Sequence, residues 1–278
     1  MVSLCDVKGF MRIYHQSLTV LEDLPDYSKR MTDHIKRVVR ADTEVVLHGM
    51  AEGSYDANYP GGDIRHRALF NLHSMQWMAH ALKAQDTGFD AFAMCTMPDP
   101  LLTEIRSILD IPVVGSGESC FKLAGSYGQK FGMLLFIDLM AERYRQQIDS
   151  MGLSAFSVGV QPVGFGFADV LKGFDHPGPL IDLFKVAARK MIAQGADVII
   201  LGEIPLSLIL ASEGVFRIDD TPIMDSLAVT LKTTELMVDL KNMTGLSPCR
   251  RGWSQAQPSI QRVRSLMDFY GLSRFLNS

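Results

Sequence analysis

The 278-residue chain lacks most of the features that direct a protein to a membrane, to secretion or to nucleic acid. No apolar run approaches the roughly 18 residues of a membrane span, and residues 1–8 are too polar for the apolar core of a secretory signal. The net charge is -4 and no basic cluster extends beyond Arg250-Arg251, which argues against a surface for nucleic acid or anionic lipid. We therefore expect a cytoplasmic protein that acts on a small molecule, without a nucleic-acid or membrane partner.

Cysteine is also scarce, and complete cofactor motifs are absent. The chain has four cysteines without a C-x-x-C spacing, which argues against common zinc sites and fits reduced thiols. The turns at Gly115 and Gly164 lack the remaining glycines and the acidic residue of a dinucleotide-binding fingerprint. His66, His73 and His80 recur every seven residues, which on a helix places successive rings roughly 10.5 Å apart, too far to share an ion. We expect neither a metal nor an organic cofactor.

One element of the chain occurs twice. Residues 88–98 and 195–205 each begin at a glycine that ends a helix, continue through a short apolar strand and break into a polar loop at a proline. The offset is constant, because 195 minus 88 and 205 minus 98 both give 107, and a second echo follows at 110–116 and 220–226. Two βα units can look alike by chance, but two repeats in the same order favour half-chains related by a pseudo-two-fold axis, with one cleft between them.

The order of the expected elements indicates the fold class. Besides the two repeated strands, we expect strands at 12–15, 44–47, 112–115, 131–136 and 154–160, and helices at 64–84, 101–109, 120–127, 180–194 and 225–243. This alternation predicts an α/β protein with parallel sheets in two pseudo-symmetric Rossmann-like lobes, and an active site in the cleft between them. Lobe one is expected to comprise residues 1–115 and 222–278, with a covering tail from 244, and lobe two residues 116–221.

The loops that end the repeated strands carry the candidate chemistry. Glu203 interrupts an apolar stretch, where a carboxylate needs water, a partner or a catalytic task; the alternative is a carboxylate that stabilises the N-terminus of a helix near Pro205. Thr96 occupies the matching position in the first repeat, and Cys95 precedes it. A thiol at a strand end can act as nucleophile or acid/base if its pKa is lowered, and the alternative is a packed core thiol. The repeat favours Thr96 as the side chain that faces the cleft.

Six segments, in a fixed order along the chain, carry a resemblance to a known family. They are Ile13-Tyr14-His15-Gln16-Ser17, Thr96-Met97-Pro98-Asp99-Pro100, residues 111–118, Leu201-Gly202-Glu203, Pro222-Ile223-Met224-Asp225 and residues 247–252. On these motifs the chain resembles the Asp/Glu/hydantoin racemase superfamily, and most closely its hydantoin or allantoin racemase branch, over nearly all of its length. The order of the motifs is specific, although each motif alone would not be.

The resemblance implies a cleft in which two cysteines face each other, one removing a proton from the substrate carbon and the other returning one to the opposite face. Here both positions have changed, to Thr96 and Glu203, and a shift of one residue would make Cys95 the first cysteine. A threonine hydroxyl is too weak a base to take a proton from carbon, whereas a desolvated glutamate with a raised pKa can do so. One carboxylate base, a hydroxyl or thiol opposite it, and backbone N–H groups that stabilise an enolate or oxyanion are expected to remain.

We therefore expect a cofactor-independent acid/base enzyme, racemase-like or isomerase-like, with Glu203 as the base. Its substrate would be a small carbonyl, carboxylate or cyclic amide compound, held by contacts from Tyr14, Gln16, Ser17, His48, Gly49, Met97, Phe136 and Ile204. The alternatives are a hydrolase of amides or lactones, a decarboxylase or lyase on the same fold, and a non-catalytic ligand-binding protein. Leu135-Phe136 replaces a polar strand end of the family, so a more apolar pocket is expected. We also expect a homo-oligomer.

Overall fold

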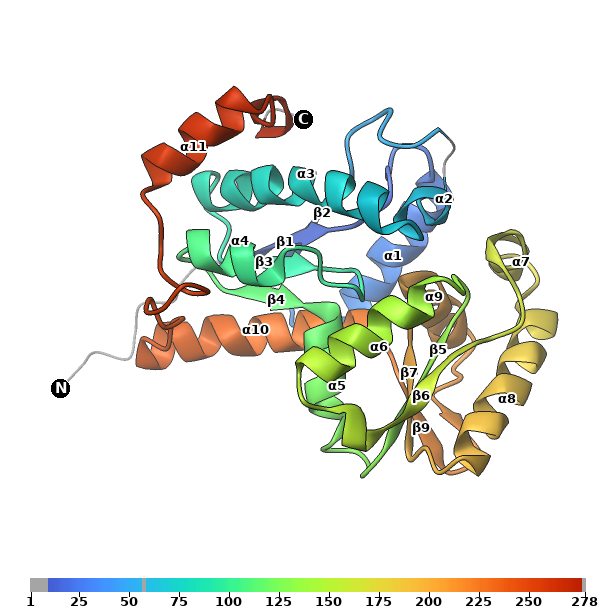
Figure 1. Ribbon diagram of the computed structural model, residues 1–278. Coiled ribbons are helices and arrows are strands. Elements are labelled where there is room, and N and C mark those ends of the chain that lie inside the picture. The colour runs from blue at the N-terminus through green and yellow to red at the C-terminus, as the bar shows by residue number, and fades with distance from the viewer. Residues whose placement is uncertain (1–9, 57–58, 277–278) are drawn as a thin grey trace.

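The computed structural model describes residues 10–56 and 59–276, which form two sheets covered by helices (Figure 1). The first sheet has the strand order β2-β1-β3-β4, and every neighbouring pair is parallel. Its strands are β1 (Met11–Gln16), β2 (Thr43–His48), β3 (Ala91–Met94) and β4 (Val113–Gly115). Both β3 and β4 are buried along their whole length, as is usual for parallel strands with helices on both faces. Parallel pairing brings the carboxyl ends of these strands, and the loops that follow them, to one edge.

The second sheet has the order β6-β5-β7-β9-β8. Its strands are β5 (Phe131–Leu135), β6 (Ser157–Pro162), β7 (Val198–Leu201), β8 (Arg217–Ile218) and β9 (Thr221–Met224). All neighbouring pairs are parallel except β8 and β9. The predicted α/β class with parallel sheets is therefore confirmed. Ile223 and Met224 pair with β7 in the second sheet, so β9 crosses the lobe boundary that the sequence suggested at residue 222.

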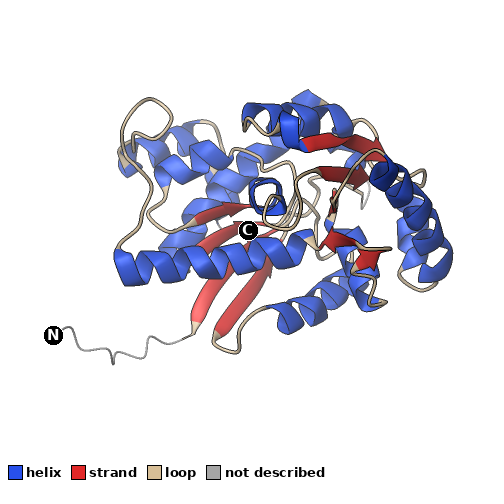
Figure 2. Ribbon diagram, turned by 90° about the horizontal axis from the view of Figure 1, so that it is seen from below, coloured by secondary structure: helices blue, strands red, loops and turns tan. Residues whose placement is uncertain are grey.

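Helices lie outside the strands of both sheets (Figure 2). They are α1 (Pro25–Val38), α2 (Gly61–Ile64), α3 (Arg67–Asp86), α4 (Leu102–Ile108), α5 (Ser116–Ala124), α6 (Met140–Ser150), α7 (Phe167–Gly173), α8 (Pro177–Ala193), α9 (Ile204–Ser212), α10 (Ser226–Thr244) and α11 (Ile260–Phe269), with short 3₁₀ turns η1 (Ser154–Phe156) and η2 (Ser273–Leu276). Helix α10 packs against the first sheet and contacts α5, whereas α6 and α8 pack on β6. Within the described ranges, no helix combines the length and the apolar character that a membrane span requires.

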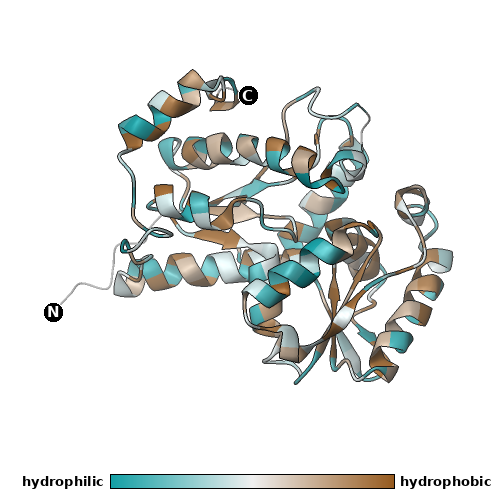
Figure 3. Ribbon diagram, viewed as in Figure 1, coloured by the Kyte–Doolittle hydropathy of each residue, from teal (hydrophilic) through white to brown (hydrophobic). Residues whose placement is uncertain are grey.

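Two helices differ from the expected elements. Helix α6 was not expected, although its buried side chains recur at helical spacing and its outer face is hydrophilic (Figure 3). The helix expected at 120–127 begins earlier, at Ser116, because a side chain from another loop accepts hydrogen bonds from its first N–H groups. After α10 the chain returns across the first lobe, where Arg264 forms an ion pair with Asp86 at 2.7 Å.

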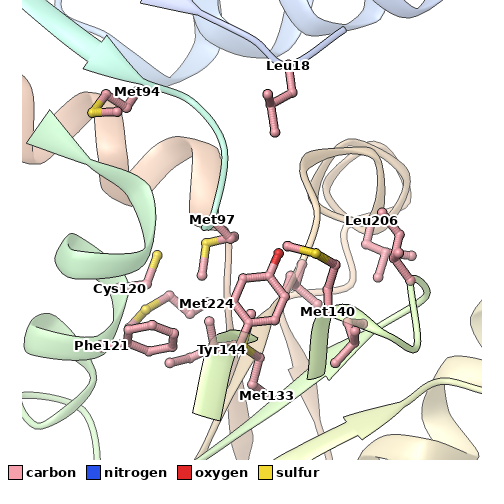
Figure 4. Packing of buried hydrophobic residues seen from close by; sticks show 14 of the residues in the cluster. Leu18, Met94, Met97, Cys120, Phe121, Met133, Met140, Tyr144, Leu206 and Met224 are labelled. Atoms are coloured by element: carbon pink, nitrogen blue, oxygen red, sulfur yellow. The ribbon is translucent and has the colours of Figure 1, made fainter. Parts of the chain in front are cut away.

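Sulfur-containing and aromatic side chains fill the space between the loop after β3 and the second sheet. In Figure 4, Met97 from this loop and Met140 from α6 lie on either side of the Tyr144 ring, with Met133 and Met224 nearby. All five side chains are buried. Burying a side chain of this size contributes roughly 1.5–3 kcal/mol, so this cluster helps to fix the loop against the second lobe.

Asp99 also fixes the loop after β3. Its buried carboxylate accepts hydrogen bonds from the backbone N–H groups of Gly117 (3.0 Å) and Glu118 (2.7 Å), and from the Gln147 side chain (2.8 Å). Burial raises the pKa of Asp99 to about 7, against the opposing effect of the two backbone N–H donors. A Cβ atom at Gly115 would lie 2.6 Å from the Asp99 Cγ, so only glycine leaves room for this carboxylate at the start of α5.

Replacing Asp99 with alanine should lower the free energy of unfolding by about 2 kcal/mol or more, because buried N–H donors lose their acceptor. Alanine would also have to adopt the left-handed backbone of this position, where φ is 46°. Asp99→Asn keeps an acceptor oxygen and tolerates that backbone, so it should cost clearly less. Denaturant unfolding followed by circular dichroism measures both variants, and equal losses would contradict this role of the carboxylate.

Candidate active site

A cavity of about 80 Å³ lies at the ends of β3 and β7, between the two lobes. Seven of the residues that the sequence suggested line it: Ser17, Cys95, Thr96, Met97, Phe136, Glu203 and Ile204. The two loops matched by the internal repeat therefore open onto one cavity. A larger neighbouring groove of about 670 Å³ contains none of these seven residues. Their roles in binding and catalysis stay predictions.

Glu203 directly follows β7 and stands at the N-terminus of α9. Its backbone is extended, with φ −140° and ψ 143°, and its side chain does not cap its own helix. The carboxylate instead accepts hydrogen bonds from the backbone N–H groups of Phe136 (3.2 and 3.1 Å) and Ile137 (3.2 Å), which follow β5. The buried charge is thus compensated by a neighbouring loop of the same lobe rather than by a cap on α9.

The burial of Glu203 changes its acid/base behaviour. The residue is 9% exposed, and burial raises its pKa to about 8. The N–H donors of Phe136 and Ile137 act in the opposite direction, and the negative charge of Asp138 adds to the rise. A carboxyl group that titrates near neutral pH can both accept and release a proton under ordinary conditions, which is the requirement for a general acid or base.

Thr96 and Cys95 differ in how they meet the cavity. Cys95 is 3% exposed and packs in the apolar cluster that contains Ala93 and Tyr27, and burial raises the pKa of its thiol far above the ordinary value. Thr96 is partly exposed, and its hydroxyl has no hydrogen-bond partner among the residues that the structure describes. Thr96 is therefore free to hydrogen-bond a ligand, whereas Cys95 has the character of a protonated core thiol.

Aromatic side chains that the sequence patterns did not single out complete the cavity. They are Tyr27, Tyr59, Tyr144, Phe167 and Phe174, and they come from both lobes. The Tyr144 hydroxyl donates a hydrogen bond to the Gly202 carbonyl (3.1 Å), next to the catalytic candidate. Of the described residues that line the cavity, Glu203 alone carries a formally charged side chain. The more apolar pocket expected from the sequence is thus present around one carboxylate.

Four expected substrate contacts lie outside this lining: Tyr14, Gln16, His48 and Gly49. Tyr14 is 1% exposed and stacks on His48 with a centroid distance of 3.5 Å. The Gln16 amide donates to the Gly49 carbonyl (2.9 Å), and its oxygen is hydrogen-bonded to His80 (2.6 Å). Tyr14 and Gln16 are buried and His48 and Gly49 are partly buried behind the end of β1, where they support Ser17, the neighbour that reaches the cavity.

The described residues contain no group of three or more histidine, cysteine or acidic side chains arranged to hold a metal ion. The protein is thus a two-lobed α/β protein with a site in the cleft between the lobes. The Thr96 hydroxyl enters this site from the end of a strand in one lobe, and the Glu203 carboxylate enters it from the end of a strand in the other. The model of the Asp/Glu/Hydantoin racemase family matches residues 25–234. The chain belongs to this family.

One protein of known activity resembles the chain in sequence, and two solved structures resemble it in fold. A hydantoin racemase of Pseudomonas sp. (strain NS671) is 23% identical over 163 residues, which cover 58% of this chain and 64% of the relative. The matched region thus spans less than two thirds of that protein. The structure of an allantoin racemase from Pseudomonas fluorescens aligns over 90% of this chain and 97% of its own with a TM-score of 0.73 and 19% identity. The structure of an allantoin racemase from Klebsiella pneumoniae aligns over 90% of this chain and 94% of its own, with a TM-score of 0.69 and 17% identity.

The raised pKa of Glu203 predicts a pH-dependent effect on stability. The folded state holds the proton to about pH 8, whereas the unfolded carboxyl releases it near its ordinary value of 4.5, so stability falls as pH rises through this window. Glu203→Gln removes this penalty and should raise the free energy of unfolding by about 5 kcal/mol at pH 9, with little gain at pH 4.

The exposed Glu213, at the end of the same helix, provides the matched control. Glu213→Gln should leave the pH dependence of stability unchanged. Urea denaturation between pH 4 and pH 9 measures all three proteins. A gain for Glu203→Gln that is the same at every pH would show that the carboxyl is not desolvated in the folded state.

Proposed function

We propose that this protein is a cofactor-independent, racemase-like enzyme that removes and returns a proton at a carbon next to a carbonyl group, with Glu203 as the base. The observation that carries this proposal is the carboxylate itself. It is buried in a cavity at the strand ends, and its pKa is raised to about 8. Family membership supports proton transfer at carbon as the reaction class.

The geometry around Glu203 favours a base over a purely structural carboxylate. Two backbone N–H donors orient it, but a carboxylate has about four acceptor positions, so capacity remains toward the cavity. A preorganised and weakly solvated base needs little rearrangement to take a proton. The hydroxyl of Thr96, from the other lobe, supports a role in holding a substrate oxygen rather than in taking a proton from carbon.

The lining of the cavity favours an uncharged substrate. No lysine or arginine is among the described residues that line it, so a free substrate carboxylate would be buried beside Glu203 without a cation to pair with. Hydantoin and allantoin, the compounds in the names of the similar racemases, are ring amides without a carboxylate. We therefore favour a small cyclic amide with an apolar substituent, which the surrounding aromatic rings can contact.

Activity should depend on Glu203 with a defined pH profile. With single enantiomers of 5-benzylhydantoin, allantoin, aspartate and glutamate as probes, polarimetry should show inversion of a ring amide rather than of the amino acids. Because the base works deprotonated, kcat/KM should rise as pH increases through about 8. Glu203→Gln should reduce kcat by about 10² to 10⁴, while Glu213→Gln stays at the wild-type rate.

The same probes distinguish the alternative reaction classes. A racemase introduces deuterium at the substrate carbon in D₂O, without change of the ring. Incorporation of ¹⁸O from labelled water, with ring opening and no deuterium at carbon, would instead show a hydrolase. Full turnover by Glu203→Gln would remove the glutamate from the mechanism. The expected homo-oligomer stays a separate prediction.

A further inference from the structure

Inversion at carbon requires a second proton donor, because the proton must return to the face opposite the base. We propose that Tyr59 is this second acid and that its hydroxyl delivers the proton to the face of the carbon opposite Glu203. The inference rests on the proton-transfer function proposed above. Tyr59 comes from the first lobe, between β2 and α2, whereas Glu203 belongs to the second lobe, and both line the same cavity.

The other cavity-lining groups are poorly suited to this task. Besides Glu203 and Tyr59, the described titratable residues of the lining are Tyr27, Cys95 and Tyr144. Tyr144 already donates its hydroxyl proton to the Gly202 carbonyl. Tyr27 and Cys95 are buried in one apolar cluster, which leaves their polar atoms little access to a substrate, whereas Tyr59 is only partly buried. The Thr96 hydroxyl is too weak an acid to supply a proton efficiently.

The Tyr59 hydroxyl is free to contact a substrate and is close enough to Glu203 to interact with its charge. Its ring is half-buried, and its hydroxyl has no hydrogen-bond partner in the described ranges. Burial raises the pKa of Tyr59 to about 12, and the Glu203 carboxylate contributes to that rise. The ring stacks on Phe167 at the start of α7, with centroids 3.9 Å apart and planes inclined by 12°. This stack joins the first lobe to the second and fixes the phenol at the cavity.

Gly61 makes room for this placement. A Cβ atom at this first residue of α2 would lie 2.0 Å from the Tyr59 Cζ and 2.1 Å from its hydroxyl oxygen. The tyrosine ring therefore lies back over the start of α2, in space that any other residue would fill. Gly61→Ala displaces the phenol without removing it, which provides a second test of position as distinct from chemistry.

The proposed reaction consists of two proton transfers and returns both side chains to their starting states. For the enantiomer whose hydrogen faces Glu203, the carboxylate takes the proton as the carbon–hydrogen bond breaks, and the electron pair passes into the enolate of the adjacent carbonyl. Tyr59 then gives its hydroxyl proton to the opposite face, a new carbon–hydrogen bond forms, and a phenolate remains. Water returns a proton to the phenolate and removes one from the Glu203 carboxyl. No oxidant or further reactant is consumed.

Tyr59→Phe keeps the stacked ring and removes only the hydroxyl, so it separates exchange from inversion. Each enantiomer of 5-benzylhydantoin is incubated in D₂O with the variant, and deuterium at carbon and configuration are followed by mass spectrometry and chiral chromatography. Inversion should fall by about 10²-fold or more. One enantiomer should still exchange its hydrogen with retention of configuration, through Glu203, whereas the other should lose exchange as well.

Three further variants serve as comparisons for Tyr59→Phe. Gly61→Ala should reproduce the loss of inversion, and Tyr127→Phe, at an exposed tyrosine away from the cavity, should invert at the wild-type rate. Glu203→Gln should abolish exchange of the enantiomer that Tyr59→Phe still exchanges. Inversion by Tyr59→Phe near the wild-type rate, or equal loss of exchange for both enantiomers in a folded variant, would overturn the role of Tyr59. Absence of exchange and inversion in the wild type would overturn the proposed function itself.

Discussion

The burial of one carboxylate at the end of β7 is the constraint on which the site depends. Glu203 interrupts an apolar strand and helix, and its charge is tolerated because backbone N–H groups of Phe136 and Ile137 point at it. These donors follow β5, the neighbour of β7 in the second sheet. Strand pairing therefore sets the position of the Glu203 carboxyl, and incomplete solvation keeps its pKa high.

The first lobe contains a second buried carboxylate, that of Asp99, which also accepts hydrogen bonds from backbone N–H groups. Asp99 accepts N–H groups at the start of α5 and a side-chain amide from α6, which holds the loop that carries Thr96. Because α6 belongs to the second lobe, this contact also links the two halves of the cleft. The two carboxylates thus have different settings: Asp99 holds its loop through three hydrogen bonds, whereas Glu203 lines the cavity and keeps acceptor capacity toward it.

The sequence predicted those parts of the site that are local. A constant offset between two apolar strands was enough to bring Thr96 and Glu203 to one cavity, since parallel strands end at the same edge. The sequence could not indicate Tyr59. The position of its ring depends on stacking with Phe167, more than 100 residues away, and on the space left at Gly61. Tyr14 and His48 were expected at the substrate, but alternation along β1 and their mutual stacking place them behind the cavity.

The most direct test of the central claim is the titration of the Glu203 carboxyl itself. Infrared difference spectroscopy follows the C=O stretch of protonated carboxyl groups as a function of pH, and subtraction of the Glu203→Gln spectrum isolates this residue from Asp99 and the surface acids. The account predicts a midpoint at about pH 8. A midpoint near 4.5, the ordinary value for glutamate, would show a solvated carboxylate and contradict the assignment of Glu203 as the base.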